Sequence, residues 1–229
     1  MTLEETLAQI KPLDKNAMDV AAKRWDSIAK PLHSLGKMEK LVIQIAGITG
    51  NPDMKIQKRA LVPMCADNGV VEEGVTQTGQ EVTAIVAENF LSGDTSACVM
   101  SRQCGTKVIP VDIGMAVDTK VSKELKVAYG TANMTKGPAM TRAQAVQALE
   151  AGIEMVRRLK EEGYGLLATG EMGIGNTTTS SAVASVLLDR SVEEMTGRGA
   201  GLSGDGLNRR IFLPHRLEKK SMQSEKQLK

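Results

Sequence analysis

The sequence predicts an α/β fold, in which helices flank a parallel β-sheet and a helical segment precedes it. Three short apolar runs alternate with helical patterns, and each run ends in a turn-forming or glycine-rich stretch. Alternating strands and helices form βαβ units, whose strands lie parallel and are buried on both faces. The core is expected to be aliphatic, because only five of the 229 residues are aromatic.

Residues 1–50 are expected to be helical. The chain turns at residues 30–36, where Pro31 and Gly36 favour a loop. Apolar side chains then recur at helical spacing and give an amphipathic stripe. The stripe comprises Leu35, Met38, Leu41, Val42 and Ile45, and it ends at Gly47 and Gly50.

Three apolar runs are expected to be buried strands, at residues 60–66, 107–114 and 164–170. The first run is almost wholly apolar and ends at Asp67-Asn68-Gly69, which is a turn signal. Pro63 makes a central position in the sheet less favourable for this strand, because proline cannot donate to the hydrogen-bonded ladder.

Helices are expected between and after these strands, at about residues 80–91, 94–103 and 177–188, and the clearest one lies between the second and third strands. Thr141 and Gln144 begin that helix with a capping box, and Gly163 stands where a C′ glycine belongs. Its apolar face is expected to contain Val146, Leu149, Ile153 and Val156.

The composition argues against a nucleic-acid-binding or membrane-spanning protein. The formal charge is only +2, and stacking aromatic residues are scarce. No window approaches the roughly 20 apolar residues that span a bilayer, and the first residues lack the apolar core of a signal peptide. Three cysteines without CxxC spacing and two histidines predict neither a disulfide framework nor a metal site. A reduced, cytoplasmic protein is expected.

The most informative segment is the glycine-rich stretch at residues 170–179, between the third predicted strand and the helix after it. Backbone N–H groups of such a turn, together with the positive end of the following helix, favour a phosphate. The stretch lacks the Gly-Lys-Ser/Thr ending and does not match GxGxxG, so neither common phosphate loop is present. The alternative is a plain strand-to-helix turn that Asn176 or Thr177 caps.

Polar residues flank this stretch at the expected carboxyl edge of the sheet. Because parallel strands end at one edge, Asp67, Asp112 and Glu171 are expected near one crevice. Glu171 would repel a phosphate, so it is expected to accept hydrogen bonds from ribose hydroxyls, or alternatively to cap the turn. Residues 67–83 hold hydroxyls and amides that suit the edge of a heterocycle, unless they form only a solvated connection.

Several motifs lie in a fixed order along the chain. They are Asp-x-Gly-Val at residues 67–70, Gly-Val-Thr-x-x-x-Gln-x-Val-Thr at 74–83, Gly-Glu-Met-Gly-Ile-Gly-Asn-Thr-Thr at 170–178 and Gly-Arg-Gly-x-Gly-Leu at 197–202. Further motifs are Lys-Pro-x-x-Ser-Leu-Gly-Lys-Met-Glu at 30–39, Val-Asp-Ile-Gly at 111–114, Gly-Thr-x-Asn at 130–133 and Pro-Ala-Met-Thr at 138–141. From about residue 20 to 210, the chain closely resembles the nicotinate-nucleotide–dimethylbenzimidazole phosphoribosyltransferase family.

The resemblance implies transfer of the phosphoribosyl group of nicotinate mononucleotide to 5,6-dimethylbenzimidazole or a related base, for the lower ligand of cobalamin. It also implies a homodimer of subunits with a large Rossmann-like domain and a small helical domain, and it implies no metal or other cofactor. Carried onto this sequence, the family's phosphate- and ribose-binding positions are Glu171, Gly173, Gly175, Asn176, Thr177 and Thr178. Thr76 and Gln80 would line the base pocket, and Asp67, Gly199, Gly201 and Arg210 are further candidates.

The chain departs from the family pattern towards its end. The family's general base is a glutamate far towards the C-terminus of a longer chain, and Arg210 stands where the family usually has lysine. Residues 209–229 hold seven Lys and Arg against two Asp and Glu, which leaves 22 and 25 for residues 1–208. We therefore expect a small-domain segment at residues 1–50, an incomplete large domain at 51–208 and an aberrant basic tail at 209–229.

A frameshift or assembly error near codon 210 is one explanation of this ending, and reading the neighbouring nucleotides in the other frames tests it. A natural short variant with a basic tail is the alternative. For function, two hypotheses remain open. One is a transferase that is active when the missing C-terminal part is present, and the other is a non-catalytic nucleotide-binding module that keeps only the phosphate turn.

Overall fold

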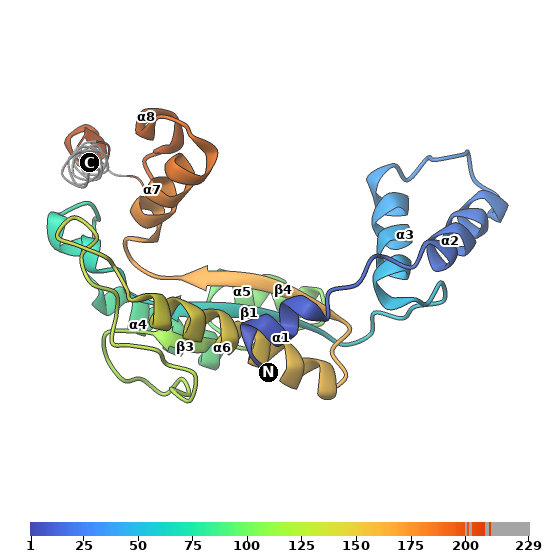
Figure 1. The fold of residues 1–229 in the computed structure, drawn as a ribbon, viewed down its shortest axis with the longest axis horizontal. Coiled ribbons are helices and arrows are strands. Elements are labelled where there is room, and N and C mark those ends of the chain that lie inside the picture. Colours follow the sequence, from blue (N-terminus) through green and yellow to red (C-terminus); the bar gives the residue numbers. More distant parts are fainter. Residues whose placement is uncertain (200, 202, 209–210, 212–229) are drawn as a thin grey trace.

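The computed structural model describes residues 1–199, 201, 203–208 and 211, and over these residues it confirms an α/β fold with a parallel sheet (Figure 1). The strands are β1 (Arg59–Ala66), β2 (Thr106–Val108), β3 (Val111–Gly114) and β4 (Leu166–Met172). The helices are α1 (Leu3–Ala8), α2 (Lys15–Ser27), α3 (Lys37–Thr49), α4 (Glu81–Ser92), α5 (Ser96–Gln103), α6 (Arg142–Glu161), α7 (Asn176–Leu188), α8 (Val192–Met195) and the 3-10 helix η1 (Gly69–Glu73).

Strand β1 lies at the centre of the sheet. Strand β4 pairs with one side of it over seven positions, from Arg59↔Leu166 to Cys65↔Met172. Strands β2 and β3 pair one after the other with the opposite side. All of these pairings are parallel, as the alternation of strands and helices predicted. Their carboxyl ends therefore share one edge of the sheet.

Prolines divide the second predicted strand in two. One strand was predicted over residues 107–114, whereas the structure has β2 and β3 with a break at Ile109 and Pro110. Ile109 N–H donates to Leu61 C=O at 2.9 Å, so the next ladder bond would need an N–H group from Pro63. Proline has none, and the ladder resumes only with β3. By alternation, the ring nitrogen of Pro110 faces the outer edge of the sheet.

Strand β4 extends further than the sequence pattern indicated. A strand was predicted over residues 164–170, but β4 includes Glu171 and Met172, so the turn to α7 starts at Gly173. Gly170 pairs with Pro63, and a Cβ on Gly170 would lie 3.1 Å from the Pro63 Cα. The glycine therefore allows β4 to approach the proline of the central strand closely.

The first 50 residues are largely helical, as predicted, and α2 packs against α3. The amphipathic stripe does not form a buried face, because Leu35, Met38 and Leu41 are all at least half exposed. Helix α3 instead buries Glu39, which forms an ion pair with Lys30 at 2.8 Å and accepts from Leu35 N–H at 3.1 Å. These contacts hold the turn at residues 30–36. The assignment of this segment to a separate small domain stays a prediction.

Helix α6 begins and ends where the sequence predicted. The Thr141–Gln144 capping box is present, and Gly163, with φ of 84°, follows the C-cap residue. The predicted apolar face is wrong in part, since Leu149 and Val156 are more than half exposed. The sequence pattern indicated the wrong buried face, because apolar residues occur on more than one side of this helix. The residues that it buries are Ala151, Met155 and Leu159.

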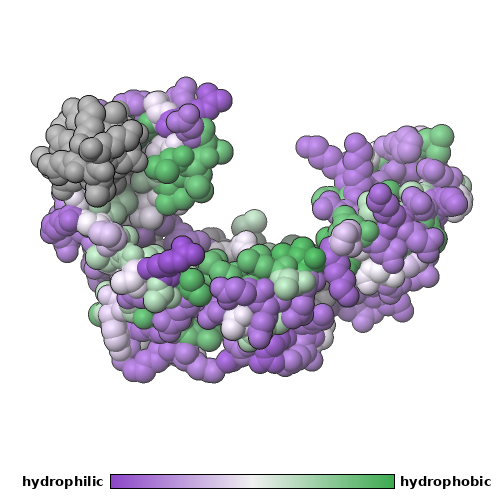
Figure 2. All heavy atoms as spheres, viewed as in Figure 1, coloured by the Kyte–Doolittle hydropathy of each residue, from purple (hydrophilic) through white to green (hydrophobic). Residues whose placement is uncertain are grey.

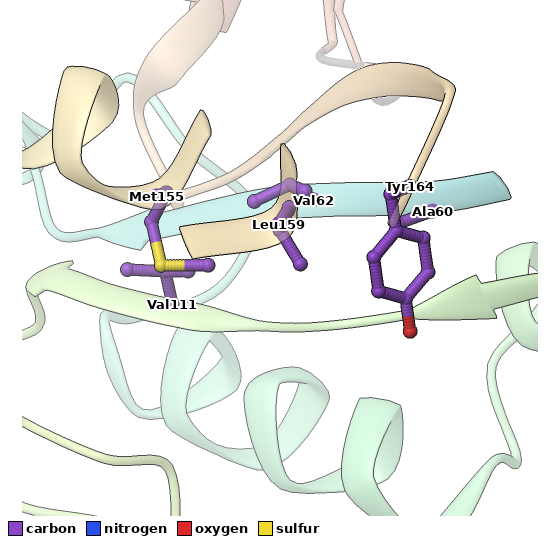
Figure 3. Packing of buried hydrophobic residues seen from close by; sticks show 6 residues of the cluster. All are labelled: Ala60, Val62, Val111, Met155, Leu159 and Tyr164. Atoms are coloured by element: carbon purple, nitrogen blue, oxygen red, sulfur yellow. The ribbon is translucent and has the colours of Figure 1, made fainter. Parts of the chain in front are cut away.

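The core forms on both faces of β1. Figure 3 shows six buried side chains gathered between α6 and the sheet: Ala60, Val62, Val111, Met155, Leu159 and Tyr164. A second cluster on the other face joins β1 and α4 and contains Cys65, Ala87, Met115 and Val121. Most of these side chains are aliphatic or small, as the scarcity of aromatic residues predicted.

The reactivity of the Cys65 thiol measures how well β1 is shielded from solvent. Burial, together with the charges of nearby carboxylates, raises the pKa of the Cys65 thiol to about 12. Because the thiolate is the reactive form, iodoacetamide at pH 8 is expected to alkylate Cys65 about 100-fold more slowly in the folded chain than after unfolding in urea. A Cys98→Ser/Cys104→Ser background isolates the site, and mass spectrometry follows the labelling. Equal rates would show that β1 is not buried.

Two pairs of helices project away from the sheet (Figure 1). Helices α2 and α3 lie beyond one end of the sheet, and α7 and α8 lie beyond the other, where β4 ends. Both pairs extend to the same side of the sheet. None of the helices in the described part of the chain has the length and apolar character needed to cross a membrane.

Candidate functional site

The turn from β4 into α7 packs tightly against the end of β1. A Cβ on Gly173 would lie 2.1 Å from the Ala66 carbonyl oxygen, and a Cβ on Gly175 would lie 2.9 Å from a Val71 methyl group. Gly175 also has φ of 90°, in the left-handed region. Glycine is therefore required at both positions for the turn to fit against β1 and η1.

The first turn of α7 directs few backbone donors towards a ligand. Its N-cap is Gly175 without a side-chain cap, so the expected alternative of a cap by Asn176 or Thr177 is wrong. The N–H groups of Asn176 and Thr178 donate within the turn, to the carbonyl groups of Gly173 and Gly175 at 3.1 and 3.0 Å. The N–H of Thr177 has no acceptor among the described residues, and it lies at the positive end of the helix dipole.

Asn68 is a central residue of this region, and it was not among the predicted site residues. Its side-chain N–H donates to Ile174 C=O at 3.2 Å, and its Oδ1 accepts from the Thr179 hydroxyl at 2.9 Å. Its backbone C=O accepts from the Gln80 side chain at 3.2 Å. The buried Thr83 hydroxyl completes the contacts by accepting from Ile174 N–H at 3.0 Å. A carboxamide beside glycine at the carboxyl end of a buried strand is the signal that identifies such a residue.

Glu171 lies next to the turn, on the last residues of β4. Its Oε2 accepts a hydrogen bond from the side-chain amide of Asn176, so its partner here is a side chain rather than the backbone of the turn. Desolvation raises the pKa of the Glu171 carboxyl above its ordinary value, and the hydrogen bond from Asn176 acts in the opposite direction. The residue remains exposed, which leaves it accessible to a ligand hydroxyl. Its role towards ribose stays a prediction.

A cavity of about 380 Å³ opens beside the start of α7. It joins the β4–α7 turn to the glycine-rich segment that follows α8. Thr178 is fully buried and is not part of the cavity wall. Hydroxyl and carboxamide groups at a helix N-terminus suit an anion such as a phosphate ester. The wall comprises Asn176, Thr177, Ser180, Ser181, Ala184, Met195, Gly197 and Gly199.

One of the two predicted base-binding residues contacts a neighbour of the same turn. Gln80 reaches it through Asn68, whereas the Thr76 hydroxyl donates to Thr78 C=O within its own loop, at 2.8 Å. The Gln77 side chain donates to Gly201 C=O. The structure therefore brings together the loop at residues 74–83, the β4–α7 turn, Gly199 and Gly201. Contacts of these residues with substrates stay predictions.

The three carboxylates gather at one edge of the sheet, as predicted, since the charges of Asp67, Asp112 and Glu171 all raise the pKa of the Cys65 thiol, but they do not share an open crevice. Asp67 and Asp112 are 1% and 0% exposed, whereas Glu171 is open to solvent. The backbone N–H groups of residues 114–116 donate to the two buried carboxylates at 2.8–3.1 Å. Buried carboxylates need such donors, so these two acids stabilise the turn after β3 instead of facing a ligand.

Asp112 also forms a buried ion pair with Lys126. The Lys126 Nζ lies 3.0 Å from Asp112 Oδ2 and 3.2 Å from Asp118 Oδ1, and the lysine side chain is 6% exposed. Burial disfavours the charged lysine, but the two carboxylates outweigh it and raise the Lys126 pKa above its ordinary value. The ammonium also lies 4.1 Å from the centre of the Tyr129 ring. The ion pair therefore ties β3 to the loop that follows it.

Other predicted motifs line a second cavity, whose wall includes Ala66 at the end of β1. A largely apolar cavity of about 680 Å³ on the α6 side of the sheet includes parts of the motifs at residues 111–114, 130–133 and 138–141 in its wall. Among the residues that the structure describes, no three His, Cys, Asp or Glu side chains are grouped to hold a metal ion. Arg210 and nearly all of the predicted basic tail lie outside the described residues.

Comparison with known proteins identifies the family. A family model described as "Phosphoribosyltransferase" matches residues 10–217. The chain belongs to this phosphoribosyltransferase family. The matched range extends slightly beyond residue 210, where the resemblance was expected to end.

Individual phosphoribosyltransferases confirm the resemblance found in the motifs. The nicotinate-nucleotide–dimethylbenzimidazole phosphoribosyltransferase of Ruminiclostridium cellulolyticum is 50% identical over 213 residues, which are 92% of this chain and 60% of the relative. The Clostridium tetani protein of the same name is 48% identical over 219 residues, 94% of this chain and 60% of the relative. A crystal structure of the Thermus thermophilus enzyme of that name has a TM-score of 0.80 and 36% identity, covering 89% of this chain and 61% of that chain. The chain thus spans about 60% of the length of these relatives.

Proposed function

We propose that this chain binds nicotinate mononucleotide and takes part in transferring its phosphoribosyl group to 5,6-dimethylbenzimidazole or a related base. The products would be α-ribazole 5′-phosphate, for the lower ligand of cobalamin, and nicotinate. One observation carries the proposal. The glycine-rich turn at the start of α7 places Glu171 and a cavity of about 380 Å³ side by side, in a chain 50% identical to a protein of that name.

The proposed binding mode assigns each part of the nucleotide to a described group. The phosphate lies in the cavity, near the N–H and hydroxyl of Thr177 and the Asn176 amide. Glu171 accepts hydrogen bonds from the ribose hydroxyls. The acceptor base lies towards Gln80 and Thr76, whose loop contacts the same turn through Asn68. Each assignment places a polar group against a partner of complementary hydrogen-bonding character.

The reaction needs alignment more than strong chemistry from this region. The bond between the anomeric carbon and nicotinate breaks, and a bond to an unprotonated imidazole nitrogen forms. The proton on the other ring nitrogen passes to a general base, which in the family is a glutamate far towards the C-terminus. No described residue is assigned that role. The described residues would supply positioning, which lowers the barrier by fixing the reacting atoms in a productive geometry.

The coverage of about 60% also favours a second candidate, a module that binds the nucleotide without turnover. One pair of measurements separates the two. Calorimetry reports binding of nicotinate mononucleotide, and chromatography reports nicotinate release after addition of 5,6-dimethylbenzimidazole. Binding with release supports the transferase, binding without release supports the module, and absence of binding contradicts both. The proposal also includes that the protein is a homodimer and that it works in the reducing cytoplasm. Light scattering measures whether the chain forms a dimer.

Glu171→Gln is expected to weaken nicotinate mononucleotide binding about tenfold at pH 7.5, because a hydrogen bond to a charged acceptor contributes roughly 1.5 kcal/mol or more. The wild-type chain is also expected to lose affinity as the pH falls through the raised pKa of Glu171, since protonation removes the acceptor. Calorimetry across this pH range measures both effects.

The ligand phosphate titrates near pH 6 as well, so the variant provides the reference. Only the difference between wild-type and Glu171→Gln profiles belongs to the carboxylate. Glu162→Gln, which removes an exposed carboxylate at the C-cap of α6, is the matched control and is expected to bind like wild type. If the wild-type and Glu171→Gln chains have parallel pH profiles, the assignment of Glu171 to the ribose hydroxyls is contradicted.

A further inference from the structure

Helix α7 presents its apolar residues to solvent and buries its hydroxyl-bearing ones. Val183, Val186, Leu187 and Leu188 are 52–77% exposed, whereas Thr178, Ser181 and Ser185 are buried. This is the reverse of a surface helix, which turns polar residues outwards. A helix that is apolar on its outer side is typical of a position inside a larger fold. The apolar outer face of α7 therefore needs a cover.

Strand β4 leads into α7 and is uncovered as well. Within the described residues it pairs only with β1, so its second side offers seven residues of unpaired backbone. Leu166, Ala168 and Thr169 are exposed on its two faces. Strands of parallel sheets are normally covered on both faces, so a strand this open is exceptional.

The two edges of the sheet differ in a way that points to β4. The opposite edge consists of two short strands, separated where Pro110 directs its ring nitrogen outwards, and such an edge cannot readily accept another strand. Strand β4 has no proline and continues for seven residues. Figure 2 shows apolar residues gathered along α7 and over the region of β4, on the sides that face the hollow between the two projecting helix pairs. An open strand edge and an apolar helix face thus border the same hollow (Figure 2).

We propose that the free edge of β4 and the Val183–Leu188 face of α7 bind a polypeptide equivalent to the part of the relatives that this chain does not match. The relatives are longer, since the chain spans only about 60% of them, which supplies an occupant of suitable length. A parallel strand would pair with β4, and an apolar helix would cover α7. The binding requires no covalent link, because backbone pairing and apolar burial also form between separate chains, although association then costs translational and rotational freedom. This proposal does not depend on the transferase reaction.

The test uses the full 229-residue chain with an affinity tag, co-expressed with an untagged segment of the Ruminiclostridium cellulolyticum relative that follows its matched residues. The expected result is co-purification in a 1:1 ratio, seen by light scattering. Hydrogen exchange is expected to slow at least tenfold in residues 166–172 and 183–188 on complex formation. Absence of co-purification, or a complex with unchanged exchange in both segments, contradicts the proposal.

Variants locate the contact surface. Val186→Asp/Leu187→Asp is expected to lower the affinity for the segment at least tenfold, and circular dichroism checks that the chain stays folded, as substitution of exposed residues should allow. Met100→Asp on α5, an apolar residue of similar exposure, is the matched control and is expected to bind like wild type. Equal effects of the two changes would overturn the assignment. Self-association of the chain that the α7 variant abolishes would overturn it too, in favour of a second copy.

Discussion

Gly173→Ala is expected to destabilise the chain by about 3 kcal/mol and to abolish measurable binding of nicotinate mononucleotide. The added Cβ would lie 2.1 Å from a backbone oxygen of Ala66 and 2.9 Å from Glu171 Oε1. A backbone atom cannot rotate away as a side chain does, so either the turn or the end of β1 has to move. Urea denaturation followed by circular dichroism measures the stability, and calorimetry measures the binding.

Gly152→Ala provides the matched control for this substitution. Gly152 lies in α6, and a Cβ there meets nothing within 4 Å. Alanine is expected to stabilise the chain by about 0.5–1 kcal/mol, because it lowers the entropy lost in helix formation. Loss of stability at both glycines to a similar extent would show that the clash at Gly173 is not the cause.

Lys126→Met is expected to destabilise the chain by about 3 kcal/mol, because it leaves the carboxylate of Asp112 buried without its counter-charge. Methionine keeps most of the length and apolar volume of the lysine stem, so the effect comes mainly from the lost ammonium group. Asp112 retains the hydrogen bonds from the backbone after β3, which limits the loss. Urea denaturation at pH 7 measures the change.

Lys123→Met is the control for the ion pair. Lys123 contacts the same Asp118, but both side chains are about half exposed or more, so the expected loss of stability is much smaller than for Lys126→Met. If the two lysine variants lose equal stability, the buried Lys126–Asp112 pair contributes no more to the free energy of unfolding than the exposed Lys123–Asp118 pair. A larger loss for Lys126→Met supports the role of that pair in holding the loop after β3.

The elements of the fold were predictable where local chemistry decides them. The capping box at Thr141 identified the start of α6, and alternating apolar runs identified the parallel sheet. The break between β2 and β3 was not predicted, because it depends on Pro63 of a neighbouring strand. The buried face of α6 and the exposure of the α3 stripe also depend on which surfaces meet in space, and sequence periodicity alone does not contain that information.

The candidate site was predictable in its outline but not in its internal contacts. Glycine spacing identified the turn at residues 173–175, and motif order associated it with residues 74–83 and 197–201. Asn68 was missed because its importance comes from contacts with residues more than 100 positions away. Asp67 and Asp112 were misjudged for a related reason: a strand-end carboxylate facing a ligand and one satisfied by nearby backbone N–H groups look alike in sequence.

The contacts of Asn68 link the binding of one ligand to the affinity for a second one. Its backbone carbonyl contacts the Gln80 loop, while its side chain contacts Ile174 and Thr179 beside the phosphate turn. A ligand that reorients Gln80 would therefore shift Asn68 and its contacts with the β4–α7 turn. A ligand bound in that turn would shift the loop that contains Gln80 in the same way. Such coupling is reciprocal by thermodynamic necessity, so nucleotide and base would change each other's affinity by the same factor.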